Sequence, residues 1–410
     1  MAKVRKDSKG RVLHKGESYN RIKGLYCYNF TDPSGNRIFI YSRDLGDLRD
    51  REEEIAKNRL DKIDLYTRSR SDLNYLFDRY IATKTELRST TMTNYVYTYD
   101  RYVRNGFGKR KISDIKYSDV LMFYNSFLEK GLKVSTVDSM HCVLHPAFQM
   151  AVRDCIIRIN PTDGVMAELK KKLKGRSEPR HALTIEEERA FLKYLEKPEN
   201  ERWKSLFIVM FGTGCRVGEI IGLRWEDVDF EKNTICINHN ITYYPRHDND
   251  YKCEYRVALP KTEAGIRTIP MLDKVRETLQ KEKAYQESSG MKCISEVDGM
   301  SGFIFFNRFG MLHSPSSINR EIKRMVDDHN ASEEVKASRE HREPVLIPKF
   351  SCHITRHTFC SRLCENETNL KCIQEVMGHR DIQTTMNVYA EFSEAKKQEA
   401  FKQLNSRNVF

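Results

Sequence analysis

The sequence predicts a multidomain α+β protein, and three observations support this fold class. The chain has 410 residues, which is enough for two or three domains that each bury a core. Segments with strand composition occur near the N-terminus and again after residue 230, whereas long intervening stretches have helical periodicity. A run of lysines with glycine and proline near residue 175 marks an exposed connection. We therefore expect four parts, which are residues 1–67, 68–165, 166–182 and 183–410.

Residues 1–67 predict a small β-sheet module with a helix. Leu25–Phe30 and Arg37–Tyr41 are rich in aromatic and β-branched residues, and the turn residues of Asp32–Asn36 between them predict a hairpin. The charged stretch 47–57 predicts a helix. A twisted β-ribbon of this size fits a DNA major groove, although these residues alone favour a structural hairpin with a solvated face. The candidate DNA contacts here are Arg21, Lys23, Arg37 and Arg43.

Residues 68–165 predict an all-helical domain. Four apolar residues repeat at the spacing of one helix face, namely Leu73, Leu76, Phe77 and Tyr80. Further periodic stretches cover residues 91–103, 118–128 and 135–152. Asn160-Pro161 is predicted to end the last of them, because a residue that precedes proline avoids the helical conformation. Candidate phosphate contacts on the outer faces are Lys84, Arg88 and Lys133.

Residues 166–182 predict a basic linker, since Lys170–Arg180 combines lysines with glycine and proline. A charge run is usually a solvated face, but between two DNA-contacting units it would suit a strap across a duplex. Its candidate DNA contacts are Lys171, Lys174 and Arg176. The formal charge of +12 suits a polyanionic partner such as nucleic acid, and it also suits a protein that is merely basic.

The termini and cysteines predict a chain that stays in the cytoplasm without entering a membrane. Met1–Lys6 is charged with no apolar stretch behind it, and no apolar run approaches the roughly 20 residues that span a bilayer. Eleven cysteines without framework spacing fit reduced thiols. Four of them lie close in sequence but lack a C-x-x-C pair, so we expect buried thiols there and no zinc: Cys352, Cys360, Cys364 and Cys372.

The last domain opens at Thr184–Glu187, which has the form of a capping box. A helix over residues 203–211 is predicted to stop at Gly212-Thr213-Gly214, and a second helix then carries Arg216 and Glu219 one turn apart. An arginine at a glycine-marked helix start suits a phosphate, and a surface ion pair between Arg216 and Glu219 remains the open alternative.

Strand patterns follow this motif. Residues 234–238 predict a strand, and residues 256–259 and 267–270 predict a hairpin around Lys261–Gly265. Lys261 at that turn is either an ordinary exposed lysine or a mobile proton donor whose pKa is lowered by desolvation and neighbouring arginines.

Two histidine motifs and a tyrosine complete the pattern. His353-Ile354-Thr355-Arg356-His357 is predicted to open a helix. Histidines at i and i+4 suit zinc, but Ile354 stands where metalloprotease helices carry glutamate and no third ligand is evident, so no metal site is expected. Met377-Gly378-His379 fits a helix C-cap that leaves His379 free, and Tyr389 follows ten residues later.

In this order, the motifs resemble the tyrosine recombinase (phage-type integrase) family, most strongly from Thr184 to Glu391. Met377 departs mildly, because the family more often has leucine before this Gly-His. The resemblance implies an arm-type DNA-binding β module in residues 1–67 and a SAM-like core-binding domain in residues 68–165. It also implies that residues 183–410 form a mainly helical catalytic domain with a small antiparallel sheet. The N-terminal parts resemble those of integrases from conjugative transposons and temperate phages.

The resemblance also implies roles for particular residues. Tyr389 would attack the phosphorus and stay attached to the DNA 3′-phosphate, while Arg216 and Arg356 hold the non-bridging oxygens. His353 would accept the phenolic proton, since a phenol with a pKa of about 10 is mostly protonated at neutral pH. The remaining implied roles are phosphate hydrogen bonding by His379, protonation of the leaving 5′-oxygen by Lys261, and support from Glu219 and His357. No cofactor is expected.

We therefore expect a site-specific recombinase that integrates and excises a mobile element, either a conjugative transposon or a prophage. The alternatives are a non-catalytic DNA-binding regulator of the same fold, which the complete residue set disfavours, and a type IB topoisomerase, which the N-terminal module disfavours. Expected partners are double-stranded DNA with core-type and arm-type sites, three further copies in a homotetramer, an excisionase and a host DNA-bending protein. The expected location is the nucleoid in a bacterial cytoplasm. A C-terminal segment with Ala400, Phe401 and Leu404 would pack on a neighbouring copy or on its own domain.

Overall fold

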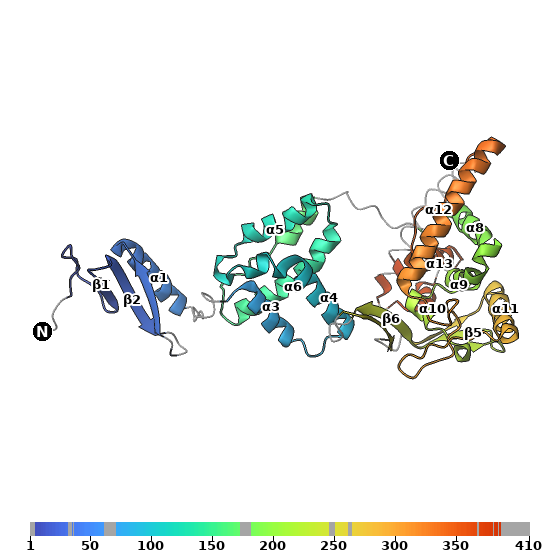
Figure 1. Cartoon of the computed structure of the whole chain (residues 1–410), viewed down its shortest axis with the longest axis horizontal. Helices are drawn as coiled ribbons and strands as arrows, with labels where there is room; N and C mark the ends of the chain where they lie inside the picture. Colours follow the sequence, from blue (N-terminus) through green and yellow to red (C-terminus); the bar gives the residue numbers. More distant parts are fainter. Residues whose placement is uncertain are drawn as a thin grey trace, which may run out of the picture. The chain divides into compact units, whose positions relative to one another are not determined.

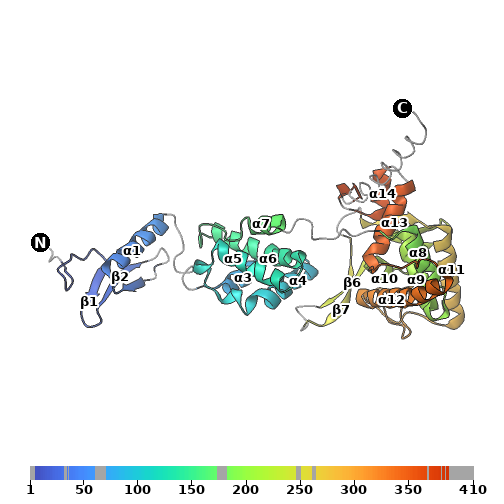
Figure 2. The same ribbon diagram turned by 90° about the horizontal axis from the view of Figure 1, so that it is seen from above.

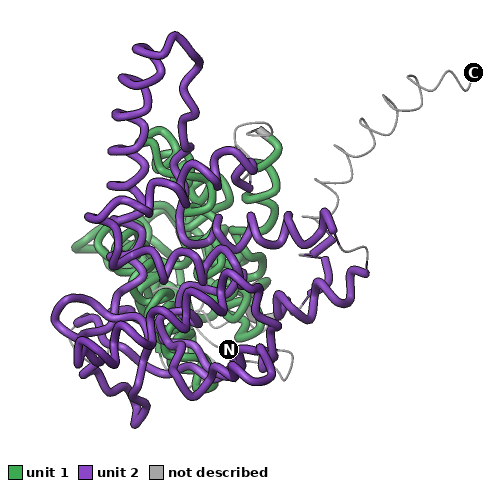
Figure 3. Tube along the Cα trace, turned by 90° about the vertical axis from the view of Figure 1, so that its right-hand side faces the viewer, with its two compact units in different colours: residues 1–177 green, residues 178–410 purple. Residues whose placement is uncertain are grey.

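The structure is a computed structural model, and it falls into two compact units, Met1–Ser177 and Glu178–Phe410 (Figure 3). It describes residues 5–31, 35, 37–60, 71–172, 182–245, 251–260, 265–366, 369–379, 381–383 and 385–386. Four candidate site residues lie outside these ranges, namely Lys174, Arg176, Lys261 and Tyr389.

The first unit begins with a three-stranded antiparallel sheet that packs against one helix (Figures 1 and 2). The elements are β1 (Glu17–Asn20), β2 (Leu25–Thr31), β3 (Arg37–Ser42) and α1 (Leu45–Leu60). The pairing of β2 with β3 confirms the predicted hairpin. Tyr26, Leu45 and Leu48 form its core, whereas Phe39 and Tyr41 are 49% and 56% exposed. The sheet therefore has one covered face and one aromatic face in solvent.

The first unit continues as a helical bundle with its own core. Its helices are α3 (Leu73–Ala82), α4 (Ser89–Tyr99), α5 (Tyr117–Glu129), α6 (Val134–Arg153) and α7 (Val165–Lys172). Short helical turns lie between α4 and α5, at Asp100–Arg104, Phe107–Lys109 and Ile112–Asp114. The four apolar residues predicted for one face of α3 are all buried. Phe77 stacks on Tyr99 of α4 with ring centroids 3.6 Å apart, and α6 packs against α3, α4 and α5.

Two predictions about this unit are wrong. The periodic stretch 135–152 forms α6, but Asn160-Pro161 does not end this helix, because Cys155 already takes a left-handed conformation with φ 56° and turns the chain. The basic linker was predicted to begin at residue 166, but α7 continues to residue 172. Met166 and Leu169 are buried in the helical core there, so apolar packing outweighs the lysines in this segment.

The second unit is mainly helical with two small antiparallel sheets. Its helices are α8 (Ile185–Tyr194), α9 (Glu201–Thr213), α10 (Val217–Ile221), α11 (Asp273–Ser289), α12 (Pro315–Glu340), α13 (Cys352–Asn366) and α14 (Leu370–Met377). Helical turns lie at Pro198–Asn200 and Trp225–Asp227. The strands are β4 (Val228–Asp229), β5 (Thr234–Ile237), β6 (Asn240–Pro245), β7 (Cys253–Ala258) and β8 (Arg267–Pro270). Helix α9 packs against α8, α11 and α13, and the predicted α+β class is confirmed.

The predicted hairpin between residues 256–259 and 267–270 is wrong. Strand β7 pairs with β6, whereas β8 pairs with β5 in a separate sheet. The register places Ile269 opposite Ile235, and both side chains are buried in the main core. This cross-strand apolar pair joins β8 to β5 rather than to its neighbour in sequence.

The cysteines of α13 are buried thiols, as predicted. Cys360 and Cys364 pack with Ile373 and Met377 in a small core between α13 and α14. Among the described residues, the group with ligand atoms close enough for a metal ion is His14, Glu17 and Glu52, which includes no cysteine. Within the same ranges, no helix combines the length and the apolar character needed to cross a bilayer.

Candidate active site

The second unit brings residues of several predicted motifs to one place. Arg216 lies at the start of α10, Arg356 lies on α13, and His379 follows the end of α14. The guanidinium groups of both arginines reach the turn directly before His379. Residues 162 positions apart in sequence, Arg216 and Gly378, therefore share one site.

Local backbone geometry sets the position of Arg216. Helix α9 ends at Gly214, which has φ 61°, a left-handed conformation that favours glycine. A side chain at this glycine would have its Cβ 2.3 Å from Cδ1 of Phe359, so α13 also packs too closely for any larger residue. Arg216 then caps α10, and its backbone N–H donates to Oε2 of Glu219 at 2.8 Å.

Glu219 is a buried carboxylate shared by two arginines. Its Oε1 accepts from Arg216 Nη1 at 2.8 Å and from Arg267 Nη1 at 3.1 Å, and its Oε2 accepts from Arg267 Nη2 at 2.8 Å. Burial acts to raise the pKa of Glu219, but hydrogen bonds and charge from Arg267 and Arg216 outweigh it and lower that pKa to about 2. The ion pair between Arg216 and Glu219 thus exists, but it is not the surface pair of the alternative prediction, because the Glu219 side chain is only 6% exposed.

Three arginines hold three consecutive carbonyl groups at the C-terminus of α14. Arg267 Nε donates to Val376 O at 2.8 Å, and Arg356 Nη2 donates to Met377 O at 2.6 Å. Arg216 Nη2 donates to Gly378 O at 2.9 Å. The last carbonyls of a helix have no partner inside the helix, and here guanidinium groups satisfy them.

Burial and neighbouring arginines lower the pKa of two basic groups of the site. Burial, followed by the charge of Arg216, lowers the pKa of Arg356 to about 10, so Arg356 remains protonated at neutral pH. Burial and then the charges of Arg356 and Arg216 lower the pKa of His379 to about 4. The His379 ring is therefore neutral at pH 7, with Nδ1 2.9 Å from Thr385 Oγ1. Guanidinium groups beside one carboxylate suit a bound phosphate.

The two histidines of α13 differ in exposure. His353 lies in the first turn of the helix and is exposed, whereas His357, one turn later, is partly buried. Lys261 and Tyr389 lie outside the described residues, so their roles stay predictions.

Most of the proposed DNA contacts are on the surface. The exposed ones among the described residues are Arg21, Lys23, Arg37, Arg43, Arg88, Lys133 and Lys171. Lys84 is partly buried, with its Nζ 4.9 Å from the centre of the Tyr80 ring. Exposure alone does not distinguish a DNA contact from a solvated side chain, so these assignments stay predictions.

Sequence reasoning missed Arg267. The strand β8 alternates in burial, with Arg267 and Ile269 inward and Thr268 and Pro270 outward. An arginine at an inward position of such a strand needs a buried counterion. The placement of Arg267 in phase with Ile269 in the sequence therefore indicated a buried, paired arginine.

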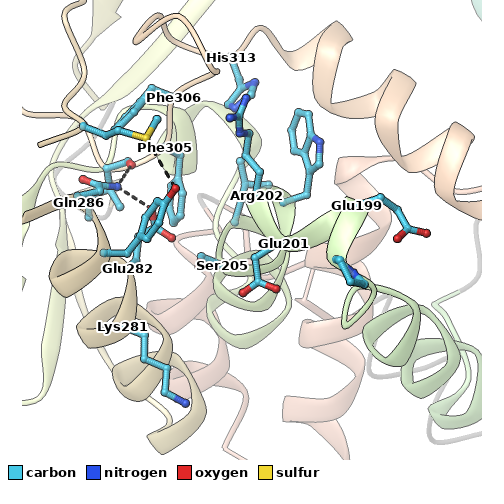
Figure 4. Close-up of a pocket in the computed structure, with 16 residues that line it drawn as sticks. Glu199, Glu201, Arg202, Ser205, Lys281, Glu282, Gln286, Phe305, Phe306 and His313 are labelled. Atoms are coloured by element: carbon cyan, nitrogen blue, oxygen red, sulfur yellow. Dashed lines mark hydrogen bonds between the residues drawn. The ribbon is translucent and has the colours of Figure 1, made fainter. Parts of the chain in front are cut away.

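A separate cavity of about 620 Å³ lies between α9 and α11 (Figure 4). Its lining includes Arg202, Glu282 and His313, and Gln286 Nε2 donates to Glu282 Oε1 at 2.7 Å. Arg216, Glu219, Arg356 and His379 are not among its lining residues. The cavity therefore does not belong to the arginine site.

Three family models match the chain. Residues 181–396 match the phage integrase family, residues 1–59 match the DNA binding domain of Tn916 integrase, and residues 73–128 match the phage integrase N-terminal SAM-like domain.

Whole-chain relatives agree with these matches. The transposase from transposon Tn1545 of Streptococcus agalactiae is 30% identical over 99% of this chain and 98% of its own length. The transposase from transposon Tn916 of Enterococcus faecalis is 29% identical with the same coverage. The solved structure of the Tn1549 transposon integrase in complex with transposon right-end DNA has a TM-score of 0.68 and 26% identity. That match covers 80% of this chain and 99% of the solved chain. The chain therefore belongs to the phage integrase family of tyrosine recombinases.

Proposed function

We propose that this chain cleaves and rejoins DNA through a 3′-phosphotyrosine bond in order to integrate and excise a mobile element. The observation that carries the proposal is the meeting of Arg216, Arg356 and neutral His379 at the C-terminal end of α14, with Arg216 paired to the buried carboxylate of Glu219. The similarity to transposases of Tn1545 and Tn916 and to a DNA-bound transposon integrase supports a conjugative transposon as the element.

In the proposed cleavage, Tyr389 Oη forms a bond to phosphorus as the bond from phosphorus to the DNA 5′-oxygen breaks. Arg216 and Arg356 hold the two non-bridging oxygens, where negative charge develops. Their guanidinium groups are already fixed by Glu219, by Gly214 O and by the α14 carbonyls. Donors that need no rearrangement stabilise the transition state more than the ground state.

Proton transfers accompany the two bond changes. His353 takes the phenolic proton of Tyr389, and Lys261 gives a proton to the leaving 5′-oxygen. His379, neutral at pH 7, hydrogen-bonds the phosphate without adding a charge. A 5′-hydroxyl of a second strand then attacks the phosphotyrosine and reverses these steps, so the phosphodiester is restored on a new partner.

The four predicted parts receive separate roles in this proposal. Residues 1–67 bind arm-type sites through the exposed sheet face with Phe39 and Tyr41, and residues 68–165 bind core-type sites. Residues beyond α7 up to 182 cross the DNA backbone, and residues 183–410 carry the chemistry. The match of residues 1–59 to the DNA binding domain of Tn916 integrase supports the first role.

We further propose that four copies act together on two duplexes, in the bacterial cytoplasm at the nucleoid. An excisionase and a host DNA-bending protein then set the direction of the reaction. Sizing of the complex on crossover DNA gives a mass of four chains if the tetramer is correct, and a mass of one or two chains contradicts it.

A nicked suicide substrate tests the chemistry. The intact protein should become covalently linked to DNA, whereas Tyr389→Phe should bind the same DNA without forming a link. A covalent link in Tyr389→Phe rejects Tyr389 as the nucleophile, and no link in either protein favours a non-catalytic regulator. Strand exchange between two labelled duplexes distinguishes a recombinase from a type IB topoisomerase, which relaxes supercoils without exchanging partners.

A further inference from the structure

We infer that Arg267 of β8 is a positioning residue for DNA cleavage. Its guanidinium connects the Glu219 carboxylate, which pairs with Arg216, to the end of α14 that precedes His379. The inference rests on the proposed function, because it assigns Arg267 an effect on residues proposed to hold the phosphate.

The first half of this joint is a bidentate contact with Glu219. Both oxygens of the carboxylate accept from Arg267, at 3.1 Å and 2.8 Å, and both side chains are almost fully buried, at 5% and 6% exposure. The Arg216 side chain, in contrast, is 44% exposed. Arg267 thus fixes the inner side of the carboxylate, and the carboxylate in turn fixes the exposed arginine.

The second half of the joint is at α14. Arg267 Nε donates to Val376 O, and the guanidinium lies so close to Gly378 that a Cβ there would be 3.0 Å from Nη1. Gly378 directly precedes His379, and Val376 lies two residues before Gly378. One planar group therefore contacts both the Glu219 carboxylate and the turn before His379.

This set of contacts requires a guanidinium. Nε, Nη1 and Nη2 of Arg267 each meet a protein acceptor, and Nη2 also lies 3.8 Å from Cys215 Sγ. An ammonium group is a single point of charge and has no planar fork, so lysine would keep the charge and lose the geometry. A buried charge is costly unless it is paired, which is why removal of one partner should disturb the other.

The test uses the full chain with Arg267→Gln and Arg267→Lys, and Arg342→Gln as a matched control. Arg342 also pairs with two carboxylates, Glu333 and Glu340, but it lies beyond the end of α12 and contacts none of the site residues. The measurements are single-turnover formation of the covalent complex on a suicide substrate, DNA affinity, and urea unfolding. We expect both Arg267 variants to cleave about 100-fold more slowly with wild-type DNA affinity, as a small misplacement of catalytic groups would cause. The control should cleave at the wild-type rate.

Two readouts separate positioning from a loss of folding. The double variant Glu219→Gln with Arg267→Gln should be no slower than the slower single variant, because both changes break one connection. In Arg267→Gln, Glu219 would face Arg216, Arg356 and Cys215 alone, so its pKa should rise. Cleavage by that variant should therefore fall as the pH is lowered from 8 to 5 more steeply than wild-type cleavage.

Each outcome decides the inference. Wild-type rates in Arg267→Gln, multiplicative losses in the double variant, or a loss that follows the unfolded fraction at every pH would overturn it. If the wild type forms no covalent complex, or if Tyr389→Phe forms one, the proposed function fails and this inference fails with it. If the wild type cleaves through Tyr389 and Arg267→Gln behaves like Arg342→Gln, only the inference fails.

Discussion

At the scale of single residues, the charged side chains of the site are held in place by hydrogen bonds. Arg356 is 4% exposed, and its guanidinium donates to Gly214 O and Met377 O on two different elements. Because these acceptors are backbone carbonyls, the side chain is positioned without neutralisation of its charge. The same positive field that suits a phosphate also changes the protonation of His379.

The first prediction concerns that protonation. His379 should titrate with a pKa of about 4, because burial and then Arg356 and Arg216 disfavour the charged ring. An ordinary histidine has a pKa near 6.5, so the unfolded chain binds a proton between these values and the native site does not. The stability that His379 contributes is therefore complete above about pH 6.5 and decreases as the pH falls toward 4.

NMR titration of the free protein measures this directly, with the His379 signal assigned by its loss in His379→Asn. The ring resonance should remain that of neutral imidazole down to pH 5. A midpoint near 6.5 would contradict the described site, because it would mean that the ring is solvated and distant from the arginines.

At the scale of elements, local patterns predicted what local interactions determine. The capping box at Thr184 and Glu187 and the left-handed caps at Gly214 and Gly378 all occur where the sequence placed them. Each cap depends on hydrogen bonds within a few residues, so the residue types at neighbouring positions are enough to predict it.

Contacts between distant segments were not predictable in the same way. The partner of β8 is the distant strand β5 and not the neighbouring β7, because Ile235 and Ile269 meet in the core. Arg267 was missed for the same reason, since its acceptors come from α10 and α14. The motifs were each recognisable in the sequence, whereas the carboxylate that Arg216 shares with Arg267 appears only in the fold.

The second prediction tests the junction at the end of α14. Gly378 and Gly290 both end a helix with positive φ, 62° and 67°, so alanine at either position should cost about 1 kcal/mol of stability. A Cβ at Gly290 meets no atom within 4 Å, but a Cβ at Gly378 meets Arg267 at 3.0 Å. Only Gly378→Ala should therefore also slow cleavage, by about 10-fold or more.

Urea unfolding followed by tryptophan fluorescence provides the stability measurement. Trp203 and Trp225, the two tryptophans of the chain, both lie in the second unit, so the fluorescence reports on that unit. Equal cleavage rates in Gly378→Ala and Gly290→Ala would show that the helix end is not coupled to the site.

At the scale of the whole molecule, separate cores accompany separate proposed roles. The N-terminal sheet has a core of Leu13, Tyr26, Leu45 and Leu48, the helical bundle has its own core, and the catalytic unit has two. A unit that buries its own apolar residues can be removed without exposing the core of another. The division into four parts that sequence composition suggests rests on turn-rich and charged connections that differ from the segments they join, and it stays a prediction.

The third prediction follows from this independence. Deletion of residues 1–67 should leave covalent cleavage of a core-site suicide substrate near the wild-type rate, because Arg216, Glu219, Arg356 and His379 all contact other parts of the second unit. The deletion should abolish retention of arm-site DNA in gel shifts and reduce integration that depends on arm sites.

A point variant provides a milder test of the same role. Arg37→Gln changes an exposed side chain of β3 without altering the core of the N-terminal module, so arm-site binding should weaken while the module stays folded. Loss of core-site cleavage in the deletion would show that the N-terminal module supports the catalytic unit, and the separation of roles would then be wrong.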